Sequence, residues 1–271
     1  MARKTLRPIR PPVAIEREYH KRLKRLIREM DRSLYYWLRA EYRKNETVIA
    51  DASERELRRK MQILLRKWRG KFKEESEDLA KWFGGSIQNF TKRNIQNQLK
   101  RIAKSSPVGF DLDFKYTSRK ERGVFNAIVQ QNVSLIKSIA EQHLTNVEGV
   151  VLRGIENGLD LSTMTSNLEQ SYGVTERRAA IIARDQTAKA TNSLSRVRLL
   201  TAGLTQGKWI HTSAGKTYRD SHVEMDGEIY DLSQGCYDED YGDYIQPAEL
   251  VNCHCTFAPV LPDVGGGDID S

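Results

Sequence analysis

The chain has 271 residues, of which 39% are hydrophobic and 8% aromatic, and its 44 Lys and Arg against 36 Asp and Glu give a net charge of +8. A chain of this length can form one or two domains with a sizeable core, and its low content of aromatic residues, glycine and proline argues against an all-β fold. It has no apolar run of about 18 residues and no apolar segment behind the basic N-terminus, so we expect neither a membrane span nor a secretory signal.

The charge divides unevenly along the chain. Residues 1–110 hold 29 Lys and Arg against 13 Asp and Glu, a net charge of +16, whereas from His211 onward 2 basic residues stand against 13 acidic ones. This division predicts that the N-terminal half meets a polyanion or an acidic protein surface, although a solvated helical face would give the same pattern. We expect the two halves to act separately, the basic half as an adaptable element and the C-terminal part as a rigid assembly module.

The N-terminal region begins with proline and arginine. Residues 1–13 are rich in both, which predicts an extended basic arm that takes no part in a core. From residue 14 to about residue 45 apolar side chains recur every three or four positions, and this spacing predicts an amphipathic helix.

A second helix should begin at Asp51 or Ser53, either of which can cap it. We expect this helix to break or kink at Gly84-Gly85, and a third helical pattern covers residues 87–102. Together these segments predict a helical hairpin or bundle in a basic helical region that spans residues 14–116.

Residues 111–116 have the pattern of a short strand, after which helices resume. Thr117 or Ser118 can cap a helix that runs to about residue 144, and residues 146–158 should form another helix.

Two more helices precede the end of the helical region. Ser162 should open a short helix that Gly173 closes. Thr175 should then cap a long helix that ends near residue 202, with Gly203 as its C-terminal glycine.

The apolar period then changes from that of helices to that of strands. Residues 208–212, 225–230 and 251–260 are expected to form strands or to lead into them, whereas residues 236–247 have the composition of a polar loop. Residues 263–271 are too poor in apolar side chains to pack and should be disordered. The fold class is therefore α+β: a predominantly α-helical N-terminal region with a C-terminal helical and small antiparallel β-sheet module.

The stretch from Trp209 to Phe257 contains all three cysteines of the chain. An odd number of cysteines fits metal binding or free thiols better than disulfides, and we expect synthesis in a reducing cytosol. In an extended strand residues two apart point to one face, so Cys253 and Cys255 should present both sulfurs on one side and His254 on the other. A disulfide between residues so close in the chain is poorly placed.

A shared tetrahedral zinc ion is an easier arrangement for the two sulfurs. His222 is the first candidate for a third ligand, so the sequence suggests one structural Zn²⁺ held by His222, Cys253, Cys255 and a further group. The fourth ligand is left open among Cys236, which we favour, His211 and Asp220. The alternative is that the cysteines are small buried hydrophobes and that His222 is a hydrogen-bonded core histidine.

A zinc-dependent hydrolase or nuclease built on His222, Cys253 and Cys255 is the alternative function, with Glu224 or Asp226 as the base. Thiolate-rich sites are more often structural, however, and the sequence contains neither a helical H-E-x-x-H nor a glycine-rich phosphate loop. We therefore expect no enzymatic activity and assign no catalytic residue.

The helix that begins at Thr175 carries two further candidates, Arg184 and Asn192. We expect both to lie on the side of the helix that meets the small sheet and to fix its strands by hydrogen bonds to loop carbonyls. Asp185 and Lys189, four positions apart, should form an ion pair on the helix surface.

Four segments in order resemble a known family: I-A-R-D-Q-T-A-K-A-T-N (182–192), the W-I-H-T-S strand, R-D-S-H-V-E-M-D-G (219–227) and N-C-H-C (252–255). They resemble the head-morphogenesis domain of phage minor capsid proteins related to the F protein of phage Mu, over roughly residues 145–260. We assign this domain to residues 117–262. Its structural motif residues are Arg184, Asn192, Trp209, Asp226, Gly227 and Asn252.

The resemblance implies a protein of tailed-phage head morphogenesis that is associated with the portal vertex. It places the protein in the capsid interior of the virion, and in the host cytoplasm during assembly. The implied partners are the portal protein and the major capsid or scaffold protein. We expect no membrane partner. The basic residues of 1–110 agree with non-specific binding to packaged DNA.

Overall fold

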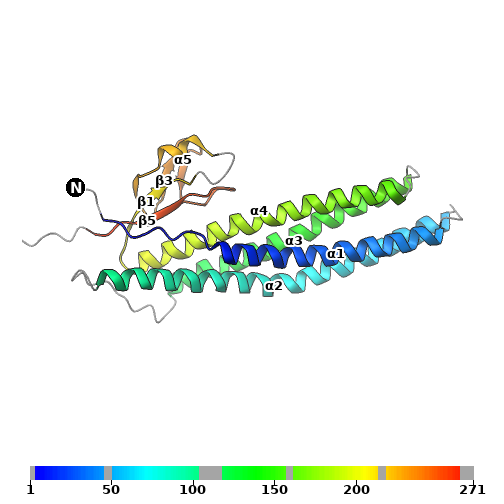
Figure 1. The fold of residues 1–271 in the computed structure, drawn as a ribbon, viewed down its shortest axis with the longest axis horizontal. Helices are drawn as coiled ribbons and strands as arrows, with labels where there is room; N and C mark the ends of the chain where they lie inside the picture. The colour runs from blue at the N-terminus through cyan, green and yellow to red at the C-terminus, as the bar shows by residue number, and fades with distance from the viewer. Residues whose placement is uncertain (1–3, 46–50, 104–117, 157–160, 213–217, 263–271) are drawn as a thin grey trace, which may run out of the picture. The chain divides into compact units, whose positions relative to one another are not determined.

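The computed structural model describes residues 4–45, 51–103, 118–156, 161–212 and 218–262 (Figure 1). The elements in chain order are α1 (Val13–Asn45), α2 (Asp51–Ala103), α3 (Arg119–Glu156), α4 (Leu161–Thr201), β1 (Gln206–Ile210), α5 (Asp220–Glu224), β2 (Ile229–Asp231), β3 (Cys236–Asp238), β4 (Asp243–Ile245) and β5 (Thr256–Pro259). Four long helices followed by short antiparallel strands confirm the α+β class. The predicted strand at 111–116 and the tail at 263–271 lie outside the described residues.

The chain forms two compact units, and neither is continuous in sequence. Unit 1 contains residues 1–16, 83–128 and 184–271, and unit 2 contains residues 17–82 and 129–183. Ile95 and Leu99 of the basic half belong to the same core as Phe257 of the last strand. The compact units therefore do not follow the expected division into a basic half and a C-terminal module, because unit 1 draws its core from both.

Unit 2 is a bundle of four helical segments in which each helix contacts the next and the last contacts the first. Polar side-chain pairs mark each contact: Lys71 with Glu29, Arg69 with Glu141, His143 with Thr175, and Lys24 with Glu176. On α1, Arg22, Glu29 and Trp37 meet Trp82, Lys71 and Lys60 of α2 in reverse order. Ser138 and His143 of α3 meet Arg178 and Thr175 of α4 in reverse order as well, so these neighbouring helices are antiparallel. This is the up-down-up-down arrangement of four-helix bundles, with fully buried Leu23, Ile27, Met30, Phe72 and Ile136 in its core.

The long helices continue through positions where the sequence predicted breaks. Residues 84 and 85 lie inside α2, residue 145 lies inside α3, and residue 173 lies inside α4. A glycine in a helix interior costs about 1 kcal/mol relative to alanine, and burial of a single large apolar side chain offsets that cost. Phe83 and Ile87, on either side of the two glycines, are both fully buried.

Two predicted helix ends are confirmed. The backbone N–H of Glu121 donates to Ser118 Oγ at 3.1 Å, which caps the start of α3. Gly203, with φ of +83°, ends α4, and the N–H groups of Gly203 and Leu204 donate to the carbonyls of Leu200 and Leu199. This pair of bonds is the Schellman motif, in which the left-handed position favours glycine. Thr175, by contrast, is inside α4, where its hydroxyl donates to the Ser171 carbonyl.

The strands of unit 1 form two small antiparallel sheets. One has the order β2-β1-β5, with Trp209 opposite Phe257 and Gly207 opposite Tyr230. The other is the hairpin β3-β4. The expected polar loop at 236–247 is therefore wrong, because its short strands bury Cys236, Asp238 and Ile245.

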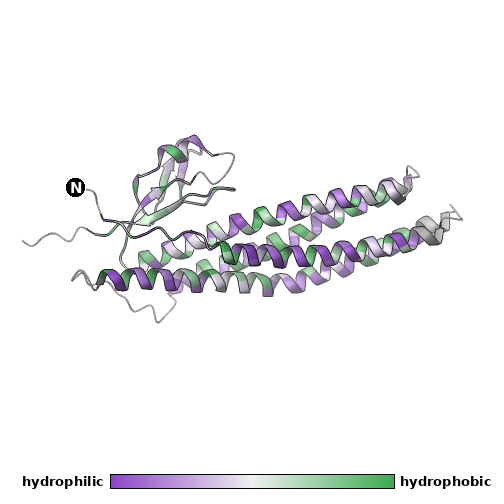
Figure 2. Cartoon of the chain, viewed as in Figure 1, coloured by the Kyte–Doolittle hydropathy of each residue, from purple (hydrophilic) through white to green (hydrophobic). Residues whose placement is uncertain are grey.

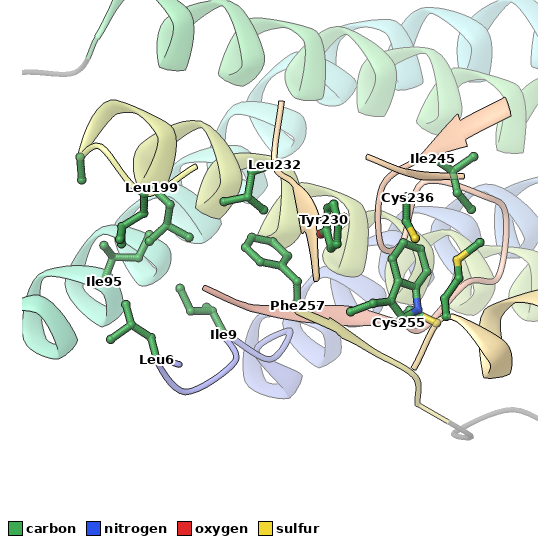
Figure 3. Packing of buried hydrophobic residues seen from close by; sticks show 14 of the residues in the cluster. Leu6, Ile9, Ile95, Leu199, Tyr230, Leu232, Cys236, Ile245, Cys255 and Phe257 are labelled. Carbon is green, nitrogen blue, oxygen red and sulfur yellow. The ribbon is translucent and has the colours of Figure 1, made fainter. Parts of the chain in front are cut away.

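The N-terminal arm is extended, as predicted, but it is part of the core. Leu6 N–H donates to the Pro259 carbonyl at 2.8 Å, and Leu261 N–H donates to the Lys4 carbonyl at 2.9 Å, so the arm pairs with the chain at the end of β5. Leu6 and Ile9 are buried, and Figure 3 shows them with Ile95 in one cluster. The exclusion of the arm from the core is wrong because an extended segment beside a strand can bury alternate side chains whatever its charge.

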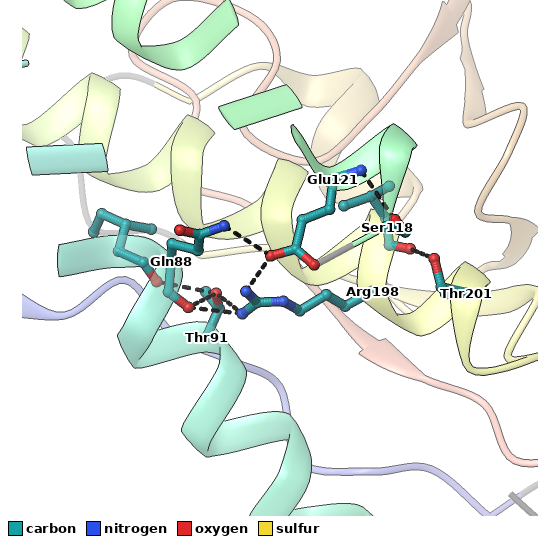
Figure 4. A network of polar contacts seen from close by, with 8 residues as sticks. Gln88, Thr91, Ser118, Glu121, Arg198 and Thr201 are labelled. Carbon is teal, nitrogen blue, oxygen red and sulfur yellow. Dashed lines mark hydrogen bonds and ion pairs between the residues drawn. The ribbon is translucent and has the colours of Figure 1, made fainter. Parts of the chain in front are cut away.

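A buried polar network joins three helices within unit 1 (Figure 4). Arg198 of α4 donates to Thr91 Oγ1 and to the Gln88 carbonyl of α2, each at 2.7 Å, and forms an ion pair with Glu121 of α3. Gln88 Nε2 donates to the same carboxylate at 3.0 Å. Because Arg198 and Glu121 are 3% and 8% exposed, this pair stabilises the unit only while both charges remain matched.

The long helices alternate hydrophilic and hydrophobic residues along their length, as Figure 2 shows by colour. No helix in the described ranges combines the length and the apolar character needed to cross a bilayer.

Candidate metal centre

His222 lies on α5 with its ring directed at two sulfurs. Its Nδ1 is 3.4 Å from Cys253 Sγ and 3.6 Å from Cys255 Sγ. The three ligand atoms lie within 4.8 Å of one another, and all three side chains are buried. The cysteines precede β5 and point to the same place, as the spacing predicted. We call His222, Cys253 and Cys255 the Cys-His cluster.

The far side of the His222 ring meets a carboxylate. Asp238 Oδ2 is 3.1 Å from His222 Nε2, and the Asp238 side chain is fully buried. A carboxylate at Nε2 holds the ring proton there and leaves the Nδ1 lone pair facing the sulfurs. The other oxygen of Asp238 accepts the backbone N–H groups of Asp240 and Tyr241, which fixes the carboxylate in turn.

The sequence did not reveal Asp238, because it lies in the segment taken for a polar loop. A signal was present in the alternation of Cys236, Tyr237 and Asp238, which places the cysteine and the aspartate on one face of a strand. Cys236 and Asp238 are buried and Tyr237 is exposed, as that alternation requires.

The candidates for a fourth ligand are distributed differently. His211 follows β1, and its Nδ1 is 3.7 Å from Cys255 Sγ. Cys236 is a buried free thiol of the same hydrophobic core, and neither it nor His211 is among the three side chains whose ligand atoms all lie within 4.8 Å of one another. Burial raises the pKa of Cys236, as expected for a thiol that packs as a small hydrophobe. Asp220 is exposed.

The two clustered thiols differ in acidity. The pKa of Cys253 is lowered because the Cys255 thiol donates to it and because His222 is adjacent, even though burial opposes the shift. The pKa of Cys255 is raised by the neighbouring Cys253 and by burial. Burial alone would lower the pKa of His222, but the bond to Cys253 and the charges of Cys253 and Asp238 raise it. Cys253 is therefore the more acidic of the two thiols.

Helix α4 anchors the cysteine segment at both ends. Asp185 Oδ1 accepts the backbone N–H of Asn252 at 3.0 Å, directly before Cys253. Asn252 has φ of +60°, a left-handed conformation that asparagine tolerates better than most residues. Asn192 Oδ1 accepts the hydroxyl of Thr256 at 3.2 Å, directly after Cys255.

The remaining motif residues support the two histidines. The buried Trp209 ring packs edge-on against His222, with centroids 5.5 Å apart. Asp226 Oδ1 accepts the backbone N–H of His211 at 2.8 Å. Gly227, with φ of +92°, donates its N–H to the Trp209 carbonyl and closes the turn beside β1. Each of these contacts fixes the position of a candidate ligand.

Arg184 is the exception among the predicted motif residues. Its side chain is 56% exposed and lies 4.0 Å from Glu16 of α1. The next residue, Asp185, has the anchoring role instead, since consecutive residues face about 100° apart on a helix. Asp185 also forms the predicted ion pair with Lys189, at 3.0 Å.

Residues 145–258 match the family described as Phage Mu protein F like protein, which confirms the resemblance over that region. An uncharacterized protein of Haemophilus influenzae is 30% identical over 192 residues, which cover 69% of this chain and 40% of the relative. The chain thus spans about two fifths of the length of that curated relative. No solved structure matches the chain.

Proposed function

We propose that the chain is a minor head protein that acts in head morphogenesis of a tailed phage. The observation that carries this proposal is the match of residues 145–258 to the Mu F-like family. Asp185, Asn192, Trp209 and Asn252, which carried the resemblance in the sequence, support it further because they share one module around the Cys-His cluster.

Other components of the head are the partners that such a role requires. We infer that the chain binds the portal protein and the major capsid or scaffold protein, and that it is carried from the host cytoplasm into the capsid interior. The acidic C-terminal segment, with 13 acidic against 2 basic residues from His211 onward, favours a protein partner for that segment over DNA.

Particle fractionation tests the proposal. Heads are purified from cells that produce the particles, with and without the portal protein, and the tagged chain is detected by immunoblotting. The chain should co-sediment with portal-containing heads and should be depleted from heads that lack the portal. A chain that remains in the soluble fraction while complete heads form would overturn the assignment.

A basic stripe on α1 supports a second contact, with packaged DNA. Lys21, Arg25, Arg28 and Arg32 follow one another at spacings of three and four residues, which places them along one side of the helix. All four are exposed. Phosphate contacts from such a stripe carry no sequence information, so the binding should be non-specific.

The salt dependence of DNA binding tests this contact. If about six phosphates are neutralised, log affinity should fall against log salt with a slope near −5. The variant K21Q/R25Q/R28Q/R32Q should reduce the magnitude of the slope by about 4, whereas Arg184→Gln, an exposed cation elsewhere, should change it by no more than about 1. Equal slopes for wild type and the quadruple variant would show that the stripe does not contact DNA, and an acidic protein surface would then be its expected partner.

A further inference from the structure

The distances around the Cys-His cluster have the dimensions of a metal site. In a zinc tetrahedron with Zn–S of about 2.3 Å and Zn–N of about 2.0–2.1 Å, each sulfur lies about 3.6 Å from each nitrogen. The structure gives three such separations: 3.4 Å from Cys253 Sγ to His222 Nδ1, 3.6 Å from Cys255 Sγ to the same nitrogen, and 3.7 Å from Cys255 Sγ to His211 Nδ1. Each is within about 0.2 Å of the tetrahedral edge.

We propose that this protein binds one structural Zn²⁺ through Cys253 Sγ, Cys255 Sγ, His222 Nδ1 and His211 Nδ1. Two thiolates and two neutral imidazoles are the ligand set of many closed zinc sites, and soft sulfur ligands in a tetrahedron disfavour Mg²⁺ and Ca²⁺. Cys253, Cys255 and His222 are 2–3% exposed, so water has little access to the metal position. The assignment does not depend on the proposed function.

Asp238 completes the site from outside the ligand set. Its contact with His222 Nε2 is the carboxylate-histidine arrangement that orients metal-bound imidazoles and raises their basicity. A fully buried carboxylate is costly without positive charge nearby. A divalent cation neutralises the charge of the two thiolates. The N–H group at His222 Nε2 can then donate its hydrogen bond to the Asp238 carboxylate.

The competing explanations account for fewer of these contacts. A disulfide between Cys253 and Cys255 would give no reason for two histidine nitrogens to face the sulfurs, and the thiols are free. Packing of the cysteines as small hydrophobes would not require Asp238 beside His222. Cys236 shows that alternative in the same core, since its pKa is raised by burial.

A metal here would join three separate segments. His211 follows β1, His222 lies on α5, and the cysteines precede β5. Strands of three to five residues supply little sheet of their own, and a metal bound only by the folded chain adds its binding free energy to folding. The site therefore stabilises the part of unit 1 where regular structure is shortest.

Metal analysis of the full-length protein, with cobalt substitution, tests the proposal. Protein from zinc-supplemented medium should contain one zinc per chain. Replacement by Co²⁺ should give the thiolate-to-cobalt charge-transfer absorption and the visible bands of a tetrahedral site. A zinc content far below one per chain, together with no charge-transfer band, would overturn the proposal.

Matched variants assign the ligands. Cys253→Ala should abolish stoichiometric zinc, whereas Cys236→Ala, at a buried cysteine outside the cluster, and His254→Ala, between the two cysteines, should retain it. Equal loss from the control variants would sink the ligand assignment.

His211→Ala decides the fourth position even if Cys253→Ala fails to fold, because His211 is only half-buried and three ligands remain. We expect zinc to bind at least about 10-fold more weakly and the visible cobalt bands to change. An unchanged affinity and spectrum would remove His211 from the site and contradict the four-ligand assignment.

Discussion

Asp238 Oδ2 lies 3.1 Å from His222 Nε2, on the opposite side of the ring from the two cysteine sulfurs. The contact decides which nitrogen carries the proton and therefore which one can bind a metal. The sequence places the two residues 16 positions apart, on α5 and β3, and nothing in their local pattern pairs them.

Asp238→Asn should weaken zinc binding without removing a ligand. Loss of the carboxylate behind a metal-bound histidine costs about 10–100-fold in metal affinity. Competition with a chromophoric chelator measures the change. Asp240→Asn, an exposed position of the same hairpin, should leave the affinity unchanged, and equal affinities for both variants would refute the orienting role of Asp238.

Arg198→Met should destabilise the protein by about 3–5 kcal/mol, because it leaves the buried carboxylate of Glu121 without its counter-charge. Adding Glu121→Leu should restore much of the loss, since an apolar pair removes the uncompensated charge. Urea unfolding gives the free energies. Arg184→Met removes an exposed arginine from the same helix and should change stability by less than about 0.5 kcal/mol. A double variant less stable than Arg198→Met would contradict this account.

Leu6→Ala should cost about 2–5 kcal/mol, because the side chain is 6% exposed in the core of unit 1. Arg10→Ala, at an exposed position in the same arm, should have little effect. Thermal and urea unfolding distinguish the two. If Leu6→Ala is as stable as wild type, the arm does not contribute to the core.

The stability of unit 2 should respond to the protonation of His143. Burial lowers the pKa of this histidine to about 4, and its separation of 3.7 Å from Asp31 is too long for a hydrogen bond that would oppose the shift. The unfolded chain takes up this proton near pH 6.5, so acidification from pH 6.5 to 4 favours unfolding by about 3 kcal/mol. Asp31 acts in the opposite direction, because burial and Glu169 raise its pKa to about 6.

Comparison with His143→Asn isolates the histidine contribution. The asparagine amide can still donate to Thr175 Oγ1, which His143 Nδ1 contacts at 2.9 Å. Unfolding free energies are measured from pH 7 to pH 4. The wild type should lose stability relative to the variant as the pH falls, and a constant difference would show that His143 titrates equally in both states.

Helices with a long apolar periodicity could be predicted from the sequence, whereas several of their ends were predicted wrongly. The positions of Gly84-Gly85 and Gly173 looked like stops, but a local propensity of about 1 kcal/mol does not decide a helix packed along its length. Ser118 and Gly203 were correct because their roles are set by bonds within one turn. Local bonding can be recognised from sequence, whereas packing between distant segments cannot.

In the candidate site, too, features set by local spacing could be predicted from the sequence, whereas those set by tertiary packing could not. The common direction of Cys253 and Cys255 follows from their spacing, and His222 was identified as their partner. Cys236, the favoured fourth ligand, shares the core with the two cysteines but lies outside the group of three ligand atoms, and this depends on tertiary packing that no spacing encodes. Asp185 was recognised as a surface ion-pair residue, but its bond to Asn252 depends on where the last loop crosses α4.

The pairing of the N-terminal arm with the end of β5 also determines when the arm can be buried during synthesis on the ribosome. Unit 2 ends at residue 183, so all its segments are synthesised before any strand of unit 1. At about 5–20 residues per second, synthesis from there to Phe257 takes roughly 4–15 s. Leu6 and Ile9 are among the first residues synthesised. Throughout that interval they lack the strand that packs against them in the folded protein. A nascent chain that stalls before β5 therefore presents this apolar arm to chaperones and proteases.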